Sequence, residues 1–330
     1  MNIEFHYYIL YMLGKYAGLD ELDCITTAYS SQYVDNNLVG HVIRIDGREI
    51  KTIPTQNYGW WSDWFPRHVY IPFHFFPGDL TYYGARRRDG RTNRLNCTPG
   101  GAFVTELLTR SLATRDFHRI GIALHTYADS WAHQNFSGEN DDWNGLGQDL
   151  PVPKVGHAEA LNQPDKITGR WKDERLDGEY VFIDNRTRFL EAAEHIYGIL
   201  CRFTGKKPHD WERFRDRLKT LIGPYDENDV RQADRISGYI LEEELLEYNK
   251  YEWLREAVVT NGNESVLEDS FKHYDKFSWL KDQVLYKTGM FKKPPLEARA
   301  GFFESRYFLW QQAARAHLKE AQDILQGILH

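Results

Sequence analysis

The stretch LHTYADSWAHQNFSG, residues 124 to 138, carries the strongest pattern in the chain. It spaces His125, Asp129 and His133 four residues apart, so on an α-helix the three side chains lie along one stripe. Imidazole nitrogens and carboxylate oxygens are ligands for Zn²⁺ and similar first-row ions. A carboxylate between two histidines can also bridge two metal ions, with one oxygen on each. The spacing therefore predicts a metal-binding helix.

The competing interpretation is an exposed helix face, because a single histidine is more often structural than a ligand. The neighbours favour an inward-facing stripe, since they are largely apolar: Leu124, Tyr127, Ala128, Trp131 and Phe136. A buried, charged Asp129 between two histidines would be costly without a partner. Metal binding accounts for this combination better than an exposed face does.

A second segment, VGHAEALNQPD at residues 155 to 165, supplies candidates from another part of the chain. His157 follows a glycine and precedes a short possible helix, and Glu159 and Asp165 lie nearby. By itself this segment is weak evidence, but metal sites draw ligands from more than one element. We therefore expect His157 and one of the two acids to join the stripe.

Helical periodicity dominates most of the chain. Gly18 is expected to end the first helix and Asp20 to open the second. The helix that carries the stripe could break near Thr114, where Asp116 would cap its second part. The expected helices span residues 4–17, 20–31, about 102–133, 187–204, 209–222, 227–260, 264–288 and 302–328.

Between the helices, residues 41 to 53 (HVIRIDGREIKTI) alternate around Asp46-Gly47, which is a strong signal for a β-hairpin. Residues 54–100 are rich in proline, glycine and aromatic residues, and residues 137–185 also have the composition of loops. Both stretches predict long ordered loops.

The composition, 42% hydrophobic and 27% charged, is that of an ordinary globular protein. Neither an internal repeat nor a Ser/Gly linker divides the chain. We therefore expect one all-α domain over residues 1–330. In it, the helices of residues 187–330 would pack against a metal-bearing half, residues 1–170.

The charges argue weakly against a general nucleic-acid binder, because 41 Lys and Arg against 48 Asp and Glu leave a net charge of −7. A local basic run could meet an anion, although a solvated loop is the simpler interpretation: Arg86, Arg87, Arg88, Arg91 and Arg94. The three cysteines are far apart and predict neither a disulfide framework nor a CxxC site. Without a secretion-signal pattern or an apolar run of roughly 18 residues, a cytoplasmic protein with no membrane span is expected.

These motifs resemble the zinc-dependent phospholipase C and S1/P1 nuclease superfamily over residues 1 to about 170. The likeness lies in an early helix with a histidine, the HxxxD pair at residues 125–129 and a later Gly-His segment. The stretch is also similar to one found in a cytosolic bacterial branch with an ALHTYADSWAHQ-like sequence. The resemblance implies an α-helical fold of the phospholipase C/P1 nuclease type that holds a three-zinc cluster.

Carried over residue by residue, the resemblance implies a set of metal ligands. Asp35 would match the early aspartate that binds metal and is the favoured general base, and Asp129 would be the bridging carboxylate. The remaining matches are His6, His74, His125, His133 and His157, with Asp165 or Glu159 as the acid after the last of them.

The candidate ligands outside the two motifs also have interpretations without a metal. His6 could be a core histidine of a tyrosine-rich helix. Asp35 could begin a turn with Asn36 and Asn37. His74 could lie in an extended segment and point away from the two phenylalanines beside it. Spare candidates are His68, His118 and His195.

The chain departs from the family pattern in three places. His133 follows Asp129 by four residues, where the family usually has six. The position four residues after His157 is Leu161, so another acid must substitute. Secreted members bind one metal through the amine of a processed N-terminal tryptophan, whereas this chain starts with Met1 and shows no signal to remove. Two ions are therefore as well supported as three.

Paired metal ions suit hydrolysis of a phosphate ester, because they activate water near neutral pH and stabilise the oxygens of the displacement. We expect Zn²⁺, with iron or manganese as alternatives, and Asp35 to assist the attacking water. The Tyr/Trp-rich residues 58–76 would wall the pocket. Motifs for other chemistries, such as GxSxG, GxxxxGK[ST] and HExxH, are absent from the sequence.

Two other classes of protein are alternatives to a hydrolase. A metal-stabilised binding or scaffold protein would be favoured by a closed site, and an enzyme by an open coordination position. A di-iron bundle needs Glu-x-x-His pairs, which Glu194-His195 and residues 242–247 do not provide. A small-molecule or lipid phosphoester is the expected substrate; charge does not favour nucleic acid. The sequence leaves the oligomeric state open.

Overall fold

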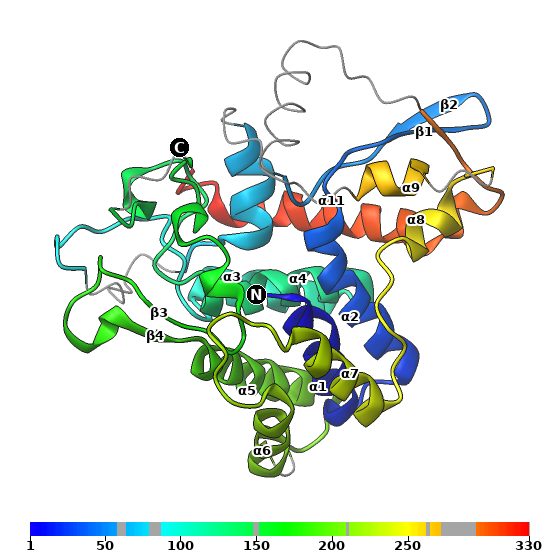
Figure 1. Cartoon of the computed structure of the whole chain (residues 1–330). Coiled ribbons are helices and arrows are strands. Elements are labelled where there is room, and N and C mark those ends of the chain that lie inside the picture. The colour runs from blue at the N-terminus through cyan, green and yellow to red at the C-terminus, as the bar shows by residue number, and fades with distance from the viewer. Residues whose placement is uncertain are drawn as a thin grey trace.

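A computed structural model of the chain is mainly α-helical, with a small sheet at one side (Figure 1). The ranges that the structure describes are residues 1–57, 64–78, 87–147, 152–208, 211–261, 265–271 and 295–329.

Helix α4, Phe117–Ala132, lies in the middle of the helical assembly. Every residue from Ile120 to Ala132 is buried, because α4 contacts helices on several sides. Asp116 caps its N-terminus as predicted, with its side chain accepting hydrogen bonds from two backbone N–H groups. The partners of α4 are α2 (Glu21–Asn36), α3 (Ala102–Ala113), α5 (Asn185–Thr204) and α11 (Arg306–Leu325).

The N-terminal helix is confirmed, but its first part is wound as a π-helix. This part, η1 (Glu4–Ile9), continues directly into α1 (Leu10–Ala17). Gly18 ends the helix in the left-handed region at φ 91°, where glycine carries no steric penalty.

The second helix, α2, begins after Asp20 as predicted but extends five residues beyond the expected end at residue 31, to Asn36. Asp35 therefore lies in the last turn of a helix, and the alternative of a turn starting at Asp35 is wrong.

The predicted hairpin is confirmed, with β1 (Val42–Ile45) antiparallel to β2 (Arg48–Lys51). Asp46 and Gly47 both have positive φ, 48° and 73°, as the two-residue turn requires. Strand β5 (Leu296–Glu297) adds to β1 in parallel and gives the sheet order β2-β1-β5. A two-residue strand so distant along the chain leaves no periodic signal in the sequence.

Residues 54–100 are not all loop. A π-helix, η2 (Pro66–His74), crosses this stretch, and the N–H of Phe75 donates to the carbonyl of Tyr70 at 2.8 Å. Proline at the first helical position is favourable, because its missing N–H needs no partner there. His74 is thus the last residue of a helix, so it lies neither in the loop that was predicted nor in the extended segment that was left open as an alternative.

Residues 137–185 are mostly irregular, as predicted. They contain an antiparallel pair, β3 (Arg170–Lys172) and β4 (Phe182–Asp184). Short 3-10 turns are η3 (Asp142–Asn144), η4 (Ala158–Ala160), η5 (Gln163–Asp165) and η6 (Gly178–Val181).

Helices α5 and α6 (Trp211–Ile222) confirm the C-terminal expectations, but the single helix over residues 227–260 is wrong. It divides into α7 (Gln232–Glu243) and α8 (Glu252–Ala257), because Glu244 takes a left-handed conformation. Of the range 264–288, the described residues form α9 (Ser265–Ser270), and residues 272–288 lie outside the described part. A 3-10 turn, η7 (Phe302–Glu304), precedes α11.

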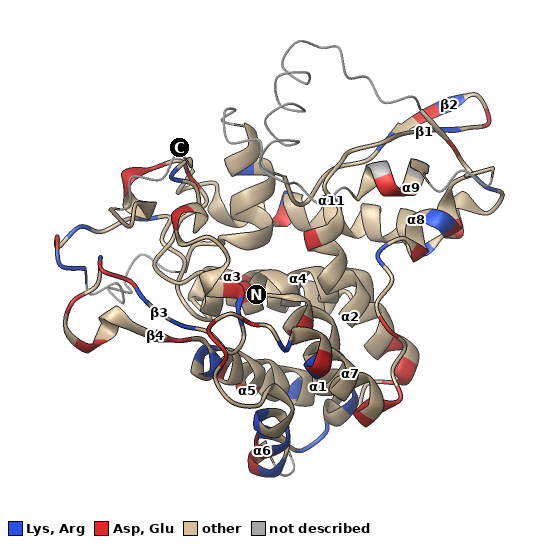
Figure 2. Cartoon of the chain, in the orientation of Figure 1, with Lys and Arg blue, Asp and Glu red and all other residues tan. Residues whose placement is uncertain are grey.

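Elements of the later half contact the first half at several points: α5 and α11 contact α4, and α7 contacts η1. Figure 2 shows both signs of charge interspersed on the outer helices and loops, for example on α6. A search of the described helices finds none that is long and apolar enough to cross a membrane.

Candidate metal centre

The predicted ligands from four separate parts of the chain meet beside α4. Three groups of ligand atoms form there, of which the first two share His125: His6, His125 and Asp129; Asp35, His74 and His125; and His133, His157 and Asp165. Two of the contributing histidines, His6 and His74, lie in the π-helical segments η1 and η2. Such wider helical turns are frequent at functional sites.

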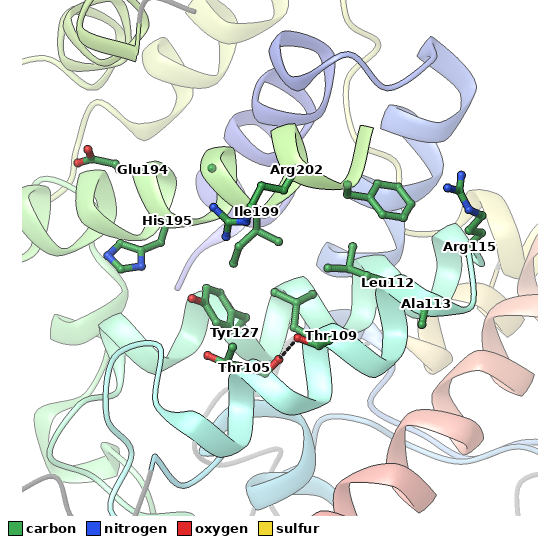
Figure 3. A pocket seen from close by; sticks show the side chains of 13 residues that line it. Thr105, Thr109, Leu112, Ala113, Arg115, Tyr127, Glu194, His195, Ile199 and Arg202 are labelled. Carbon is green, nitrogen blue, oxygen red and sulfur yellow. Dashed lines mark hydrogen bonds between the residues drawn. The ribbon is translucent and has the colours of Figure 1, made fainter. Parts of the chain in front are cut away.

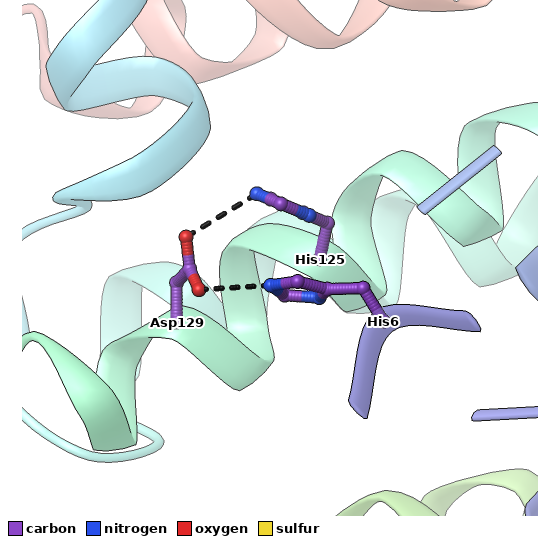
Figure 4. A group of neighbouring side chains, drawn as sticks. All are labelled: His6, His125 and Asp129. Atoms are coloured by element: carbon purple, nitrogen blue, oxygen red, sulfur yellow. Dashed lines mark hydrogen bonds and ion pairs between the residues drawn. The ribbon is translucent and has the colours of Figure 1, made fainter. Parts of the chain in front are cut away.

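Asp129 occupies the centre of the arrangement. Its Oδ1 lies 3.1 Å from Nε2 of His6, and its Oδ2 lies 3.2 Å from Nε2 of His125 (Figure 4). Its Oδ2 is also 3.3 Å from Nδ1 of His74. Each oxygen of this one carboxylate thus lies next to a different group of nitrogens.

The group on the Oδ2 side is compact. Nε2 of His125 and Nδ1 of His74 are 3.2 Å apart, and Oδ1 of Asp35 lies 3.7 and 3.8 Å from them. Ligand atoms about 2.0–2.1 Å from a tetrahedral Zn²⁺ are separated by roughly 3.3–3.4 Å. The donor spacing in this group therefore fits a small tetrahedral cation.

The group on the Oδ1 side involves the start of the chain. The ring of His6 stacks on that of His125, with centroids 3.8 Å apart and planes 23° from parallel. The buried amino group of Met1 contacts Oδ1 of Asp129 and lies 3.2 Å from Oδ1 of Asp165. The sequence does not predict an N-terminal amine here, because it starts with Met1 and not with a processed tryptophan, but the amine of Met1 lies beside Asp129 all the same.

The third group shows which acid lies beside His157. Nε2 of His133 is 3.1 Å from Oδ1 of Asp165, and Nε2 of His157 is 3.2 Å from its Oδ2. Glu159 instead accepts a hydrogen bond from the N–H of Leu146. His133 is the C-cap residue of α4, and its ring lies between two carboxylates, with Nδ1 3.6 Å from Oδ2 of Asp129 and Nε2 beside Asp165.

Backbone carbonyls orient three of the rings from outside the cluster. Nε2 of His74 donates to the carbonyl of Thr55 at 2.9 Å, and Nδ1 of His133 donates to that of His74 at 2.8 Å. Nδ1 of His157 donates to the carbonyl of Leu161 at 2.7 Å. A carbonyl can only accept, so the ring nitrogen that faces it carries the hydrogen and the other nitrogen faces the carboxylates. Backbone carbonyls orient metal-binding histidines in the same way.

Electrostatics favour a cation here. Burial alone would raise the pKa of Asp129, but His133, the amino group of Met1 and the other histidines hold it well below its ordinary value. The pKa of Asp165 is likewise well below its ordinary value, against the opposing effect of burial. Burial lowers the pKa of His6 and contributes most to lowering that of His133. Ionised carboxylates beside neutral imidazoles are the forms that bind metal ions.

Three other groups of the cluster have a pKa above its ordinary value. Desolvation raises the pKa of Asp35. For His74 and His157 burial acts to lower the pKa, but the neighbouring carboxylates raise it above the ordinary value. A raised pKa favours the protonated ring and a bound cation requires the neutral ring, so cation binding and proton binding should compete at His74 and His157.

One edge of the cluster is open. The side chains of Asp35 and Asp165 are 26% and 23% exposed, and that of His157 is 19% exposed. His6 and Asp129 are each only 1% exposed. Solvent therefore reaches the cluster at Asp35, His157 and Asp165, whereas protein encloses His6 and Asp129.

The spare histidines lie elsewhere. His68 stacks on Trp64, with ring centroids 4.5 Å apart, and His118 contacts Trp253. His195 lines an open groove of about 730 Å³ between α3, α4 and α5 (Figure 3). None of the predicted metal ligands lines that groove.

The C-terminal end of the aromatic stretch 58–76 contacts the cluster through Phe75. Phe75 stacks on the ring of His133, with centroids 4.6 Å apart, while residues 58–63 lie outside the described part. The basic run is not uniformly solvated: Arg87 is largely buried and donates to Asp89 and to the carbonyl of Trp143. Arg86 lies outside the described residues.

Comparison with known proteins returns one family. No curated protein and no solved structure matches the chain. A family profile matches residues 1–325, which include every element of the cluster. The chain therefore belongs to the "Family of unknown function (DUF6765)".

Proposed function

We propose that the protein is a metal-dependent hydrolase of a phosphate ester, with a cluster of two or three divalent ions. The observation that carries this proposal is the position of Asp129, whose two oxygens serve two groups of nitrogens next to a solvent-open edge. The same arrangement supports placing the chain near the zinc-dependent phospholipase C and P1 nuclease superfamily.

The donor chemistry supports zinc as the first choice. Each group combines imidazole nitrogens with carboxylate oxygens, which Zn²⁺ accepts in tetrahedral sites. Iron is an alternative because it also binds imidazole, and manganese because it accepts carboxylate. The amino group of Met1 lies between Asp129 and Asp165 and pairs with both carboxylates. Its pKa is raised to about 10, because the surrounding carboxylates outweigh the effect of burial.

Divalent ions, when bound, would lower the pKa of water and neutralise charge on the phosphate oxygens. The histidines would hold the ions in place, and Asp129 would hold two of them close together. Asp35 lies at the open edge, where it can accept a proton from the attacking water. The raised pKa of Asp35 reflects desolvation, and a general base with such a pKa is better matched to neutral pH.

The open edge also distinguishes the proposal from a scaffold that only uses metal for stability. A structural site would be fully ligated by protein, whereas an enzyme needs an open coordination position; the partial exposure of Asp35, His157 and Asp165, each about a fifth to a quarter, supports an open position. The substrate would be a small-molecule or lipid phosphoester. The net charge of −7 gives no support for a polyanion such as nucleic acid.

The test combines metal analysis with turnover. The protein is purified without added metal, its ion content is measured, and hydrolysis of a panel of phosphomonoesters and phosphodiesters is assayed. Asp129→Asn should lose bound ions and turnover, and Asp142→Asn, whose side chain is 76% exposed, should change neither. Activity that survives Asp129→Asn unchanged would contradict the proposed mechanism. Full ion content without turnover on any ester would favour the scaffold.

A further inference from the structure

A buried ion pair connects the N-terminal segment to the C-terminal half. Glu4 in η1 is completely buried, and Arg235 in α7 is 7% exposed. Nε and Nη2 of Arg235 each donate to a different oxygen of Glu4 at 2.8 Å. In Figure 1, α7 lies beside the N-terminal helix, and direct contacts join α7 to η1. The pair therefore fixes η1 through a two-point fork rather than a single contact.

Further polar groups complete the surroundings of this pair. The hydroxyl of Tyr239, one turn further along α7, donates to Glu4 at 3.3 Å, and the side chain of Asn2 donates to it at 3.2 Å. Asp229 takes a further N–H of Arg235. The backbone carbonyl of Asn2 in turn accepts from the N–H of His6 at 3.0 Å. The Glu4 carboxylate thus contacts α7 on one side and, on the other, Asn2, whose backbone carbonyl accepts from the N–H of His6.

The geometry of the segment explains what the pair achieves. Glu4 and His6 are two residues apart, so on a helix they point to roughly opposite sides. Glu4 reaches α7 on one side, and His6 reaches Asp129 of α4 on the other. A chain terminus usually frays unless it is tied down. Any rotation or slip of η1 would move both His6 and the amino group of Met1 away from Asp129.

An apolar pair would be a simpler way to fill this space. Burying two charges gives little stability over well-packed apolar groups, but a bidentate Arg–carboxylate pair imposes one orientation. We propose that Arg235 is a positioning residue, which holds η1 in the register that brings His6 to the ion bound on the Oδ1 side of Asp129. This inference rests on the proposed metal-dependent function.

The test is Arg235→Lys in the full-length protein, which keeps the charge but removes the two-point fork. Its affinity for the ion held on the His6 side, measured by titration with Zn²⁺ against a competing chelator, should fall ten- to a hundredfold, as losses of outer-shell partners do. Affinity on the Asp35–His74 side should stay within about threefold of wild type. Backbone hydrogen exchange over residues 4–9 should rise at least tenfold in the metal-free protein as well.

Lys15→Met is the matched control. Lys15 of α1 also pairs with α7, through Glu243 at 2.8 Å, but contacts no candidate ligand. It should leave ion affinity and exchange over residues 4–9 unchanged. Should Arg235→Lys fail to fold, Tyr239→Phe removes a single hydrogen bond to Glu4 and should give a smaller change in the same direction.

Failure of this inference can be distinguished from failure of the proposed function. If the wild-type protein binds ions and Arg235→Lys binds them with the same affinity on both sides of Asp129, the positioning role alone is overturned. A wild-type protein that binds no Zn²⁺ would overturn the proposed function and this inference together. Exchange over residues 4–9 that is equal in Arg235→Lys and wild type would also contradict the role.

Discussion

The ring of His6 stacks on the ring of His125 at 3.8 Å, although one belongs to the first helical segment and the other to the central helix α4. The Nε2 atoms of the two rings reach different oxygens of Asp129. The candidate centre is therefore complete only when the N-terminal segment is docked on α4. Ion binding and the packing of that segment should consequently depend on each other, because ligands that bind only the folded state stabilise it.

Asp35→Asn separates catalysis from ion binding. The carboxylate lies at the open edge, and its Oδ1 is 3.7 Å from Nε2 of His125. With Zn²⁺ at saturation, turnover should fall by about 10²- to 10⁴-fold, because a neutral amide cannot accept the proton of the attacking water. Steady-state kinetics at several Zn²⁺ concentrations provide the measurement. A variant that reaches the wild-type rate once saturated would leave Asp35 as a ligand only.

Removing divalent ions should lower the melting temperature. Ions present at a hundredfold excess over their Kd contribute about 2.7 kcal/mol, which corresponds to a shift of at least about 3 °C for a chain of this size. Calorimetry with and without a chelator gives the comparison. The chelator should have little effect on Asp129→Asn. An unchanged melting temperature in the wild type would argue against a bound ion.

Gly121→Ala tests the close approach of α2 to α4. A Cβ at this position would lie 2.3 Å from the carbonyl oxygen of Thr27 and 2.6 Å from Cβ of Ser30, so α2 would have to move. The free energy of unfolding should fall by about 1–3 kcal/mol, as in other overpacked cores. Ion affinity should fall too, since Asp35 is carried by α2. Chemical denaturation and Zn²⁺ titration measure the two effects.

Gly238→Ala in α7 is the control for this substitution. Its Cβ would meet only the end of Leu221 at 3.8 Å, an ordinary contact. Because alanine favours a helix over glycine, this variant should be unchanged or more stable by up to about 1 kcal/mol. An equal loss of stability in both variants would mean that the α2–α4 contact is not the reason why a larger residue at position 121 destabilises the protein.

The metal-free protein should lose stability in acid. The pKa of both Asp129 and Asp165 is well below its ordinary value in the folded state, so near pH 4 and below the unfolded chain binds more protons. Their contribution is complete above about pH 5 and is lost as the pH falls toward their folded values. Urea midpoints between pH 6 and 3, in the presence of chelator, should decline less steeply in Asp165→Asn. Parallel curves for the two proteins would contradict this assignment.

Local patterns were enough to predict a large part of the helical architecture. Asp116 caps α4, Gly18 ends α1 and Asp46-Gly47 turns the hairpin, because each depends on residues adjacent in sequence. The two π-helical segments did not follow from the same patterns. The helix that ends at His74 was missed because its prolines and aromatic residues have the composition of a loop, and the register of its turns depends on what packs against it.

The residues of the candidate site were likewise recognisable, but their grouping was not. The four-residue spacing of His125 and Asp129 places both on one face of a helix, whatever surrounds it. Whether Asp165 or Glu159 joins His157, and whether His6 faces the core or a carboxylate, depends on contacts between segments that are distant along the chain.

The amino-acid sequence by itself determined the central helix, its inward-facing stripe and the types of ligand atom available, because these follow from short-range spacing and side-chain chemistry. Only the tertiary structure decided that the Met1 amine lies beside Asp129, that Asp35 forms part of the open edge and that Arg235 holds Glu4. The physical reason is that distances between remote segments are set by how the helices pack. No periodicity within one segment records that packing.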